Sequence, residues 1–176
     1  YWTKDETGKT FTVPLTYYNV PGKGDYFLTP KAKKEEYVTE PQKYTIYGKE
    51  VLLVSLVAPI MVDTTFKGVV GVDVNLEDVQ AMLYFSEFNT SVNKLHMLSN
   101  THIRIATTDT TQPLGIASKI DGVKELDKLT DLHFVEKATQ YQATYPVYFG
   151  NSSKPWYIII EKSKWSYMTQ LLIEQF

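Results

Sequence analysis

The chain has 176 residues, of which 43% are hydrophobic, and a formal net charge of -2 at pH 7. This hydrophobic fraction is ordinary for a globular protein and argues against disorder. The balanced charge, with no basic stripe, argues against nucleic acid or an anionic membrane surface as a partner. Cysteine is absent, so disulfides, thiolate metal sites and cysteine nucleophiles are excluded.

Aromatic residues are numerous, with 13 Tyr, 8 Phe and 3 Trp. Tyrosine lines amphipathic pockets but also favours strands, so both interpretations stay open. The longest apolar run, residues 51–62, is too short to span a bilayer, and no signal peptide precedes it. Because the chain opens on Tyr1 and Trp2 rather than Met, we expect a soluble piece of a longer protein.

The first quarter of the chain is rich in turn signals. A turn is predicted at residues 4–9, a Pro- and Gly-rich loop at 17–25, and a solvated turn or short helix at 31–36. Strands are predicted at residues 44–47 and 51–57, and we expect Pro59 to end the second strand or to form a bulge.

Residues 63–67 are predicted to connect this hairpin to a strand at residues 68–74. Its β-branched valines flank small glycines, which is typical of a buried central strand. Asp73 interrupts the apolar run. A carboxylate there must find donors, find a cation, or take up a proton. Asp73 is therefore either a structural residue bonded to its neighbours or a contact for a positively charged ligand.

A helix is predicted next, with Asn75 as its N-cap and acidic residues in its first turn. Apolar residues at helical spacing extend it to about Phe88. A linker at residues 89–94 follows, and we place a domain boundary there.

The second half, like the first, is predicted to contain antiparallel strands and a helical segment. A hairpin is predicted at residues 96–107, with its tip at 99–102. Asp121 is expected to cap a helix; its apolar face would carry Val123, Leu126, Leu129, Leu132 and Val135. Later expected elements are a strand at 142–148, a turn at 150–153, a strand at 156–161 and an outgoing helix carrying Trp165, Met168, Leu172 and Phe176. The pattern predicts an α+β fold with two lobes, residues 1–88 and 89–176.

No catalytic or metal-binding motif stands out. His96, His102 and His133 lack metal-ligand spacing, and the chain has no phosphate loop, nucleophile elbow or calcium loop. Asp63 and Asp73 are spaced as in any hairpin rather than as a tuned acid/base pair. We therefore expect no enzyme activity, no metal and no cofactor.

Several short motifs nevertheless occur in an order and spacing that resemble a double Cache sensor domain. In the first half these are Gly24-Asp-Tyr-Phe27, Thr39-Glu-Pro41, Gly48-Lys-Glu-Val-Leu-Leu-Val-Ser-Leu-Val-Ala-Pro59 and Gly68-Val-Val-Gly-Val-Asp-Val-Asn-Leu76. In the second half they are Met97-Leu-Ser99, Ile103-Arg-Ile-Ala106, Leu114-Gly115, Pro146-Val-Tyr-Phe-Gly150 and Pro155-Trp156.

The resemblance implies two PAS-like lobes with antiparallel sheets, stacked along a long N-terminal helix. That helix and the first strand of the membrane-distal lobe have no counterpart here, so we expect the distal lobe to be truncated. Such domains lie on the extracytoplasmic side of the bacterial cytoplasmic membrane, between membrane-spanning helices. We expect a chemoreceptor, with a histidine kinase or a structural, dimerising lobe without ligand as alternatives, and a homodimer as a possible assembly.

The resemblance also suggests ligand-binding residues. In amino-acid-binding members, an Arg grips the ligand carboxylate just before an aromatic pair, while a Tyr and the strand Asp bind the amino group. Tyr26 and Phe27 match the pair and Asp73 the acid, and Tyr44 lies near the remaining aromatic position, which is Gln42. Gly24 stands where the Arg would be, which removes a bidentate carboxylate clamp. We therefore expect an amine or amino-acid-like ligand at Tyr26, Phe27, Tyr44 and Asp73.

Overall fold

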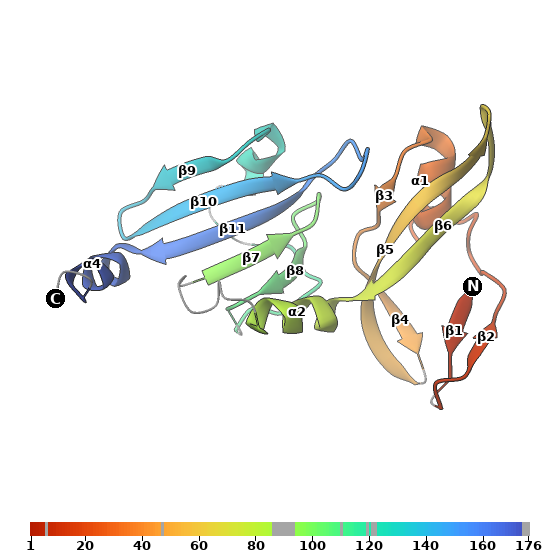
Figure 1. The fold of residues 1–176 in the computed structure, drawn as a ribbon, viewed down its shortest axis with the longest axis horizontal. Helices are drawn as coiled ribbons and strands as arrows, with labels where there is room; N and C mark the ends of the chain where they lie inside the picture. The colour runs from red at the N-terminus through yellow and green to blue at the C-terminus, as the bar shows by residue number, and fades with distance from the viewer. Residues whose placement is uncertain are drawn as a thin grey trace. The chain divides into compact units, whose positions relative to one another are not determined.

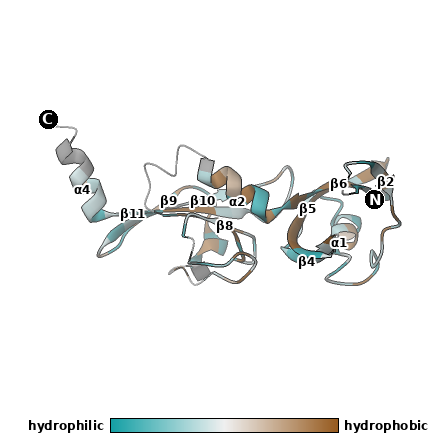
Figure 2. Cartoon of the chain, turned by 90° about the horizontal axis from the view of Figure 1, so that it is seen from below, coloured by the Kyte–Doolittle hydropathy of each residue, from teal (hydrophilic) through white to brown (hydrophobic). Residues whose placement is uncertain are grey.

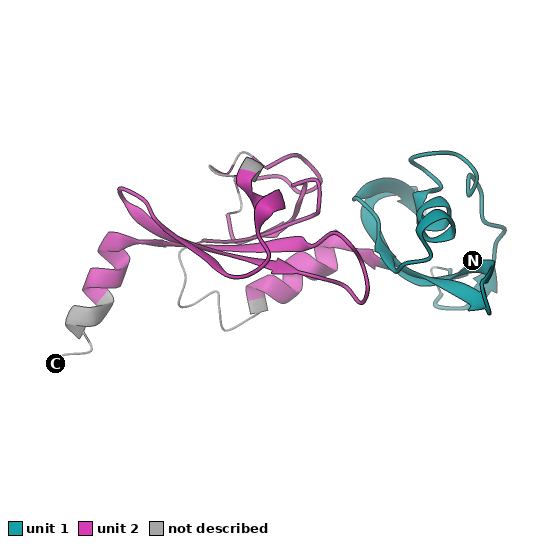
Figure 3. Ribbon diagram, turned by 90° about the horizontal axis from the view of Figure 1, so that it is seen from above, with its two compact units in different colours: residues 1–73 teal, residues 74–176 magenta. Residues whose placement is uncertain are grey.

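The computed structural model describes residues 1–5, 7–46, 48–85, 94–109, 111–118, 120 and 123–173 (Figure 1). The fold is α+β with antiparallel sheets, as expected from the sequence. It divides into two compact units, residues 1–73 and 74–176 (Figure 3). The lobe boundary expected between residues 88 and 89 lies outside the described residues and stays a prediction.

The first unit opens with a two-stranded hairpin of β1 (Trp2–Lys4) and β2 (Thr10–Thr12). Gly8 adopts a φ of 83° in the connection, a conformation that glycine reaches at no steric cost. Asp5 accepts backbone hydrogen bonds from Thr7 and Lys9, each at 2.9 Å. The turn predicted at residues 4–9 is thus confirmed.

The main sheet of the first unit is organised around β5 (Lys49–Val62), which pairs with β3 (Tyr37–Val38), β4 (Gln42–Ile46) and β6 (Thr65–Asn75). Leu53, Val54 and Val57 on β5 are buried, and the hydropathy colouring of Figure 2 shows this strand as largely hydrophobic. The strand continues through Pro59, so of the two alternatives expected for Pro59, the one in which it ends the strand was wrong. At Pro59, β5 has already passed its pairing with β3, and a strand tolerates proline where an edge is unpaired.

The expectation of a buried central strand at residues 68–74 was also wrong. Within the described sheet β6 pairs only with β5, and Val70 and Val72 are 61% and 62% exposed. Gly71 is nonetheless held close to β5, because a Cβ there would lie 2.6 Å from the carbonyl oxygen of Leu56. The valine-rich composition reflects strand propensity rather than burial on both faces.

The first unit also contains a helix that begins before the turn or short helix predicted at residues 31–36. Helix α1 (Asp25–Lys33) ends at Lys34, which has a φ of 59° and whose N–H donates to the Pro30 carbonyl at 2.8 Å. The helix packs against β5 and β3. It is only nine residues long, contains Pro30 and buries little else, so it lacks the periodic apolar face by which helices are recognised.

The second unit begins with α2 (Leu76–Phe85), which packs on β8. Asn75 caps this helix as predicted, because its Oδ1 accepts the Glu77 N–H at 3.0 Å. The end of the helix expected near Phe88 lies outside the described residues.

The sheet of the second unit is antiparallel in the order β8-β7-β11-β10-β9. The strands are β7 (Lys94–Leu98), β8 (Arg104–Thr107), β9 (His133–Glu136), β10 (Gln140–Val147) and β11 (Trp156–Ser163). Its core contains Leu98, Leu126, Tyr157 and Ile159. The predicted hairpin at 96–107 and the strands at 142–148 and 156–161 are confirmed.

The helix predicted from Asp121 was wrong in the described residues. A short 3-10 helix covers Val123–Lys128, and the segment that follows forms β9. Val135 lies opposite Gln142 of β10, so pairing with a neighbouring strand overrides the helical spacing of the apolar residues. Asp121 itself lies outside the described residues.

Helix α4 (Lys164–Ile173) follows β11 directly, as predicted. Trp165 and Met168 on this helix are exposed, and Phe176 lies outside the described residues. Among the described helices, none combines the length and the apolar character needed to cross a bilayer.

Candidate ligand-binding site

The candidate site is centred on Asp73, near the end of β6 in the first unit. Ser55 Oγ, on the neighbouring strand β5, donates a hydrogen bond to Asp73 Oδ1 at 2.6 Å. Ser55 is buried whereas Asp73 is exposed. The carboxylate is therefore oriented from the sheet side and open to solvent, where a ligand can reach it.

Ser55 is itself fixed by Thr39. The Ser55 N–H donates to Thr39 Oγ1 at 2.8 Å, and the Thr39 N–H donates to the Ser55 carbonyl at 3.0 Å. Both residues are buried. These two contacts fix the backbone of Ser55, whose side chain donates to Asp73, and this limits the freedom of the carboxylate.

Three tyrosines lie around Asp73. Burial raises the pKa of the Tyr44 hydroxyl, and the negative charge of Asp73 raises it further. For Tyr1, burial raises the pKa first, followed by the negative charge of Asp73 and by a side-chain hydrogen bond to Asp73. For Tyr26, burial raises the pKa first, followed by the nearby Tyr44 and then Asp73. All three phenols therefore stay protonated at neutral pH and lie near one carboxylate.

The tyrosines are positioned by the loop before α1 and by β4. Gln42 on β4 donates from Nε2 to the Gly22 carbonyl at 2.7 Å, and its Oε1 accepts from the Tyr44 hydroxyl at 3.4 Å. The Tyr26 hydroxyl lies 3.4 Å from the Thr16 carbonyl. Gln42, which replaces an aromatic residue in the resemblance, thus links β4 to the loop before α1.

Phe27 is placed differently from the other predicted residues. Its ring makes edge-to-face contacts with Tyr18 and Phe66, at centroid distances of 5.5 and 5.4 Å, and the Lys31 ammonium lies 5.7 Å from it. These contacts pack α1 against β6. The structure brings Tyr26 and Tyr44 to Asp73, while a ligand contact for Phe27 stays a prediction.

Gly24 occupies a position that admits no side chain. A Cβ at this residue would collide with the Tyr17 carbonyl oxygen and would lie 2.6 Å from the Tyr18 carbonyl oxygen. The arginine that would clamp a ligand carboxylate is therefore excluded by the backbone of the preceding loop. The site lacks its carboxylate clamp for a structural reason.

No lysine or arginine forms an ion pair with Asp73 in the described part of the chain. The described residues also hold no group of three or more metal-ligating side chains. An exposed carboxylate with hydroxyl neighbours and no protein cation can accept hydrogen bonds from a ligand ammonium. Tyrosine rings nearby can add cation–π attraction.

Two residues of the site were missed from the sequence alone. Ser55 interrupts the apolar run at residues 51–62, and a polar residue in a buried strand is a usable signal because it needs a partner. Tyr1 carried no such signal, since only the folded hairpin brings the start of the chain to β6.

Comparison with known proteins gives one family-model match, over the first part of the chain. Residues 1–81 match the family model described as "Methyl-accepting chemotaxis protein-like, first PDC sensor domain". No curated protein matches the chain in sequence. The resemblance to a sensor domain is thereby confirmed for residues 1–81.

Solved structures show the same fold over nearly the whole chain. The extracellular domain assigned to the histidine kinase mmHK1S-Z3 has a TM-score of 0.70 and 23% identity, with 94% of this chain and 61% of that chain covered. A structure named methyl-accepting chemotaxis protein X gives 0.65 and 18%, with 93% and 62% covered. The ligand-binding domain of the Pseudomonas aeruginosa PAO1 amino acid chemoreceptor PctB, in complex with L-Arg, gives 0.55 and 17%, with 97% and 69% covered. The chain thus spans about three fifths of the length of the first two structures.

Proposed function

We propose that the chain is the ligand-sensing part of a bacterial transmembrane chemoreceptor, with the first unit binding an amine or amino-acid-like ligand at Asp73. The domain would lie on the extracytoplasmic side of the cytoplasmic membrane. The family model supports the chemoreceptor over a histidine kinase, although extracellular domains of both kinds share this fold. In such a receptor the ligand changes the balance between two conformations by its differential affinity for them.

The observation that carries the ligand proposal is the exposed Asp73 carboxylate, fixed by Ser55 at 2.6 Å and lacking a cationic partner among the described residues. An ammonium there would form charge-assisted hydrogen bonds worth about 1.5–3 kcal/mol. Tyr26 and Tyr44 would add about 0.5–2 kcal/mol each if their rings face the cation. Because Gly24 excludes the arginine clamp, a ligand carboxylate contributes less here than the amino group does.

A thermal-shift screen against amines, amino acids and organic acids tests the ligand class. A ligand present at a hundred times its dissociation constant stabilises the folded protein by about 2.7 kcal/mol. For a chain of this size that is a rise of about 5–10 °C in Tm. We expect amines to produce the largest shifts and dicarboxylic acids to produce none. Stabilisation by acids alone would refute the proposed ligand class.

A structural lobe that binds no ligand is the competing function. It predicts no shift with any compound, and Asp73 would then serve only as a partner of Ser55. The same screen therefore separates the two functions.

A further inference from the structure

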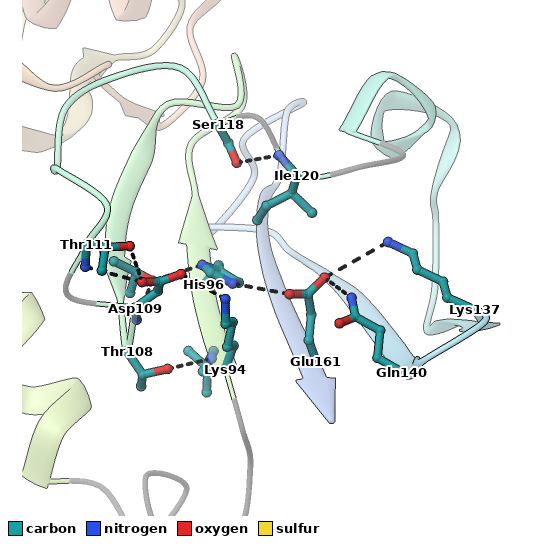
Figure 4. A network of polar contacts seen from close by, with 12 residues as sticks. Lys94, His96, Thr108, Asp109, Thr111, Ser118, Ile120, Lys137, Gln140 and Glu161 are labelled. Atoms are coloured by element: carbon teal, nitrogen blue, oxygen red, sulfur yellow. Dashed lines mark hydrogen bonds and ion pairs between the residues drawn. The ribbon is translucent and has the colours of Figure 1, made fainter. Parts of the chain in front are cut away.

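The second unit contains a buried histidine that the ligand-binding proposal does not use. His96 lies on β7, between β8 and β11, and is only 3% exposed. Its ring nitrogens face two different strands. Nδ1 lies 2.9 Å from Thr107 Oγ1 on β8, and Nε2 lies 3.6 Å from Glu161 Oε2 on β11 (Figure 4).

The hydrogen-bond pattern is compatible with a neutral ring that carries its proton on Nε2. Thr107 Oγ1 already accepts the Asp109 N–H at 3.0 Å, so its own hydrogen can be donated to His96 Nδ1. The ring proton then sits on Nε2 and points toward Glu161. At 3.6 Å this contact is too long for a hydrogen bond, and His96 Nε2 is a buried polar atom with no hydrogen-bond partner.

The charges around the ring come from several elements. Glu161 lies on β11, Lys94 on β7, Asp109 after β8 and Lys137 between β9 and β10. Lys94 Nζ pairs with Asp109 Oδ2 at 2.9 Å, and Lys137 Nζ lies 4.0 Å from Glu161 Oε1.

Glu161 contacts the ring, with Oε2 3.6 Å from Nε2, and its negative charge favours a protonated imidazole. Arg104 on β8 adds a further positive charge; it interacts with Asp109 and donates to the Pro113 carbonyl at 2.9 Å. Helix α2 contributes an uncharged amide, Gln80.

A second proton on His96 would disturb both contacts of the ring. Nδ1 would become a donor, so the Thr107 hydroxyl would have to turn its hydrogen away. The imidazolium at Nε2 would attract the Glu161 carboxylate across the present gap. Glu161 Oε1 now accepts from Gln140 Nε2 at 2.8 Å, so a move toward His96 would weaken that contact.

The two partners of His96 connect to α2 and to α4 in the second unit. Gln80 on α2 clamps the Thr107 backbone, accepting its N–H at 2.8 Å and donating to its carbonyl at 2.6 Å. Glu161 lies two residues before the end of β11, and α4 starts at the next residue, Lys164. A shift of Glu161 therefore acts on the strand that leads directly into α4.

We propose that His96 is a proton-binding site, and that its protonation in mildly acidic medium closes the gap to Glu161 and displaces the junction between β11 and α4. Imidazole is the side chain whose charge ordinarily changes between pH 5 and 8. The site lies in the second unit and uses no residue of the Asp73 cluster. The receptor would thus respond to external pH independently of its ligand.

An NMR titration of the whole chain from pH 8 to pH 5 tests this proposal. His96→Gln, His102→Gln and His133→Gln assign the three histidine ring signals by elimination, and His133→Gln, on the exposed surface of β9, is the matched control. We expect the His96 ring and the Lys164 amide to titrate with one shared midpoint. In His133→Gln both should be unchanged, and in His96→Gln the Lys164 amide should stop titrating.

Glu161→Gln is a second test variant, in which His96 itself is unchanged. Without the facing carboxylate, a proton on the His96 ring is less well stabilised, and the Lys164 amide should lose most of its pH response. A His96 ring that does not titrate in this range overturns the proposal. A ring that titrates without the Lys164 amide overturns it as well, and neither result depends on the folding of the His96→Gln variant.

Discussion

Ser55 and Asp73 form a hydrogen bond of 2.6 Å between neighbouring strands of the first unit, with the serine buried and the aspartate exposed. This bond makes Asp73 a positioned acceptor rather than a freely rotating surface carboxylate. The following predictions concern this bond, the loop before α1, and the polar contacts of the second unit.

Ser55→Ala should lower the free energy of unfolding by about 1 kcal/mol, because one hydrogen bond to a partly solvated carboxylate is lost. It should also weaken amine binding, since Asp73 would no longer be held in one orientation. Urea unfolding and calorimetric titration measure the two effects. Ser153→Ala, at an exposed turn of the second unit, is the control and should change neither. An unchanged affinity in Ser55→Ala would show that the serine does not orient the site.

Gly24→Ala should destabilise the first unit by about 1–3 kcal/mol, because its Cβ would collide with two backbone carbonyl groups that cannot move cheaply. Gly68→Ala is the matched control, since a Cβ at Gly68 meets no atom within 4 Å. Thermal unfolding of both variants measures the difference. Equal stability of the two variants would mean that the loop can open to admit a side chain.

Much of this fold follows from local sequence patterns. The hairpins at residues 4–9 and 96–107, the Asn75 cap and α4 are set by turn residues, capping and helical spacing, which act over a few residues. Helix α1 and strand β9 could not be predicted in the same way. The contacts of α1 with β5 and β3, and of β9 with β10, are made between distant segments.

In the candidate site, too, some features follow from local sequence patterns and others from contacts between distant segments. Asp73 was singled out because a carboxylate in a valine-rich strand is unusual, but its expected burial was wrong, since β6 pairs only with β5 in the described sheet. The approach of Tyr1 to Asp73 depends on how the first hairpin folds back, which no local pattern encodes.

Acid should destabilise the second unit through Asp109. The Thr111 hydroxyl and the Lys94 ammonium lower the pKa of this carboxyl to about 2. Its folded pKa is therefore below the ordinary value of about 3.9. The stabilisation it provides is fully present above about pH 5 and is lost as the pH falls toward 2. The Tm of wild type should fall toward that of Asp109→Asn across this window, and a constant difference between them would contradict the assignment.

Gln80→Ala should loosen the contact between α2 and β8. It leaves the N–H and the carbonyl of buried Thr107 without their present partners, which costs about 1–3 kcal/mol. Hydrogen exchange at the Thr107 amide should accelerate accordingly. Met82→Ala, at a 73% exposed position of the same helix, should leave this exchange unchanged. If exchange in Gln80→Ala matches that of wild type, the two hydrogen bonds of Gln80 to the Thr107 backbone do not hold β8.

The central claim is that Asp73 binds a ligand ammonium, and calorimetric titration of the best amine from the screen tests it most directly. Wild type, Asp73→Asn and the control Asp63→Asn should be compared at one ionic strength. Asp63 is exposed in the turn between β5 and β6, with a φ of 53° that asparagine also adopts. We predict that Asp73→Asn weakens binding at least tenfold, which corresponds to about 1.4 kcal/mol, while Asp63→Asn binds as wild type does. Equal affinity of wild type and Asp73→Asn for the amine would contradict the account.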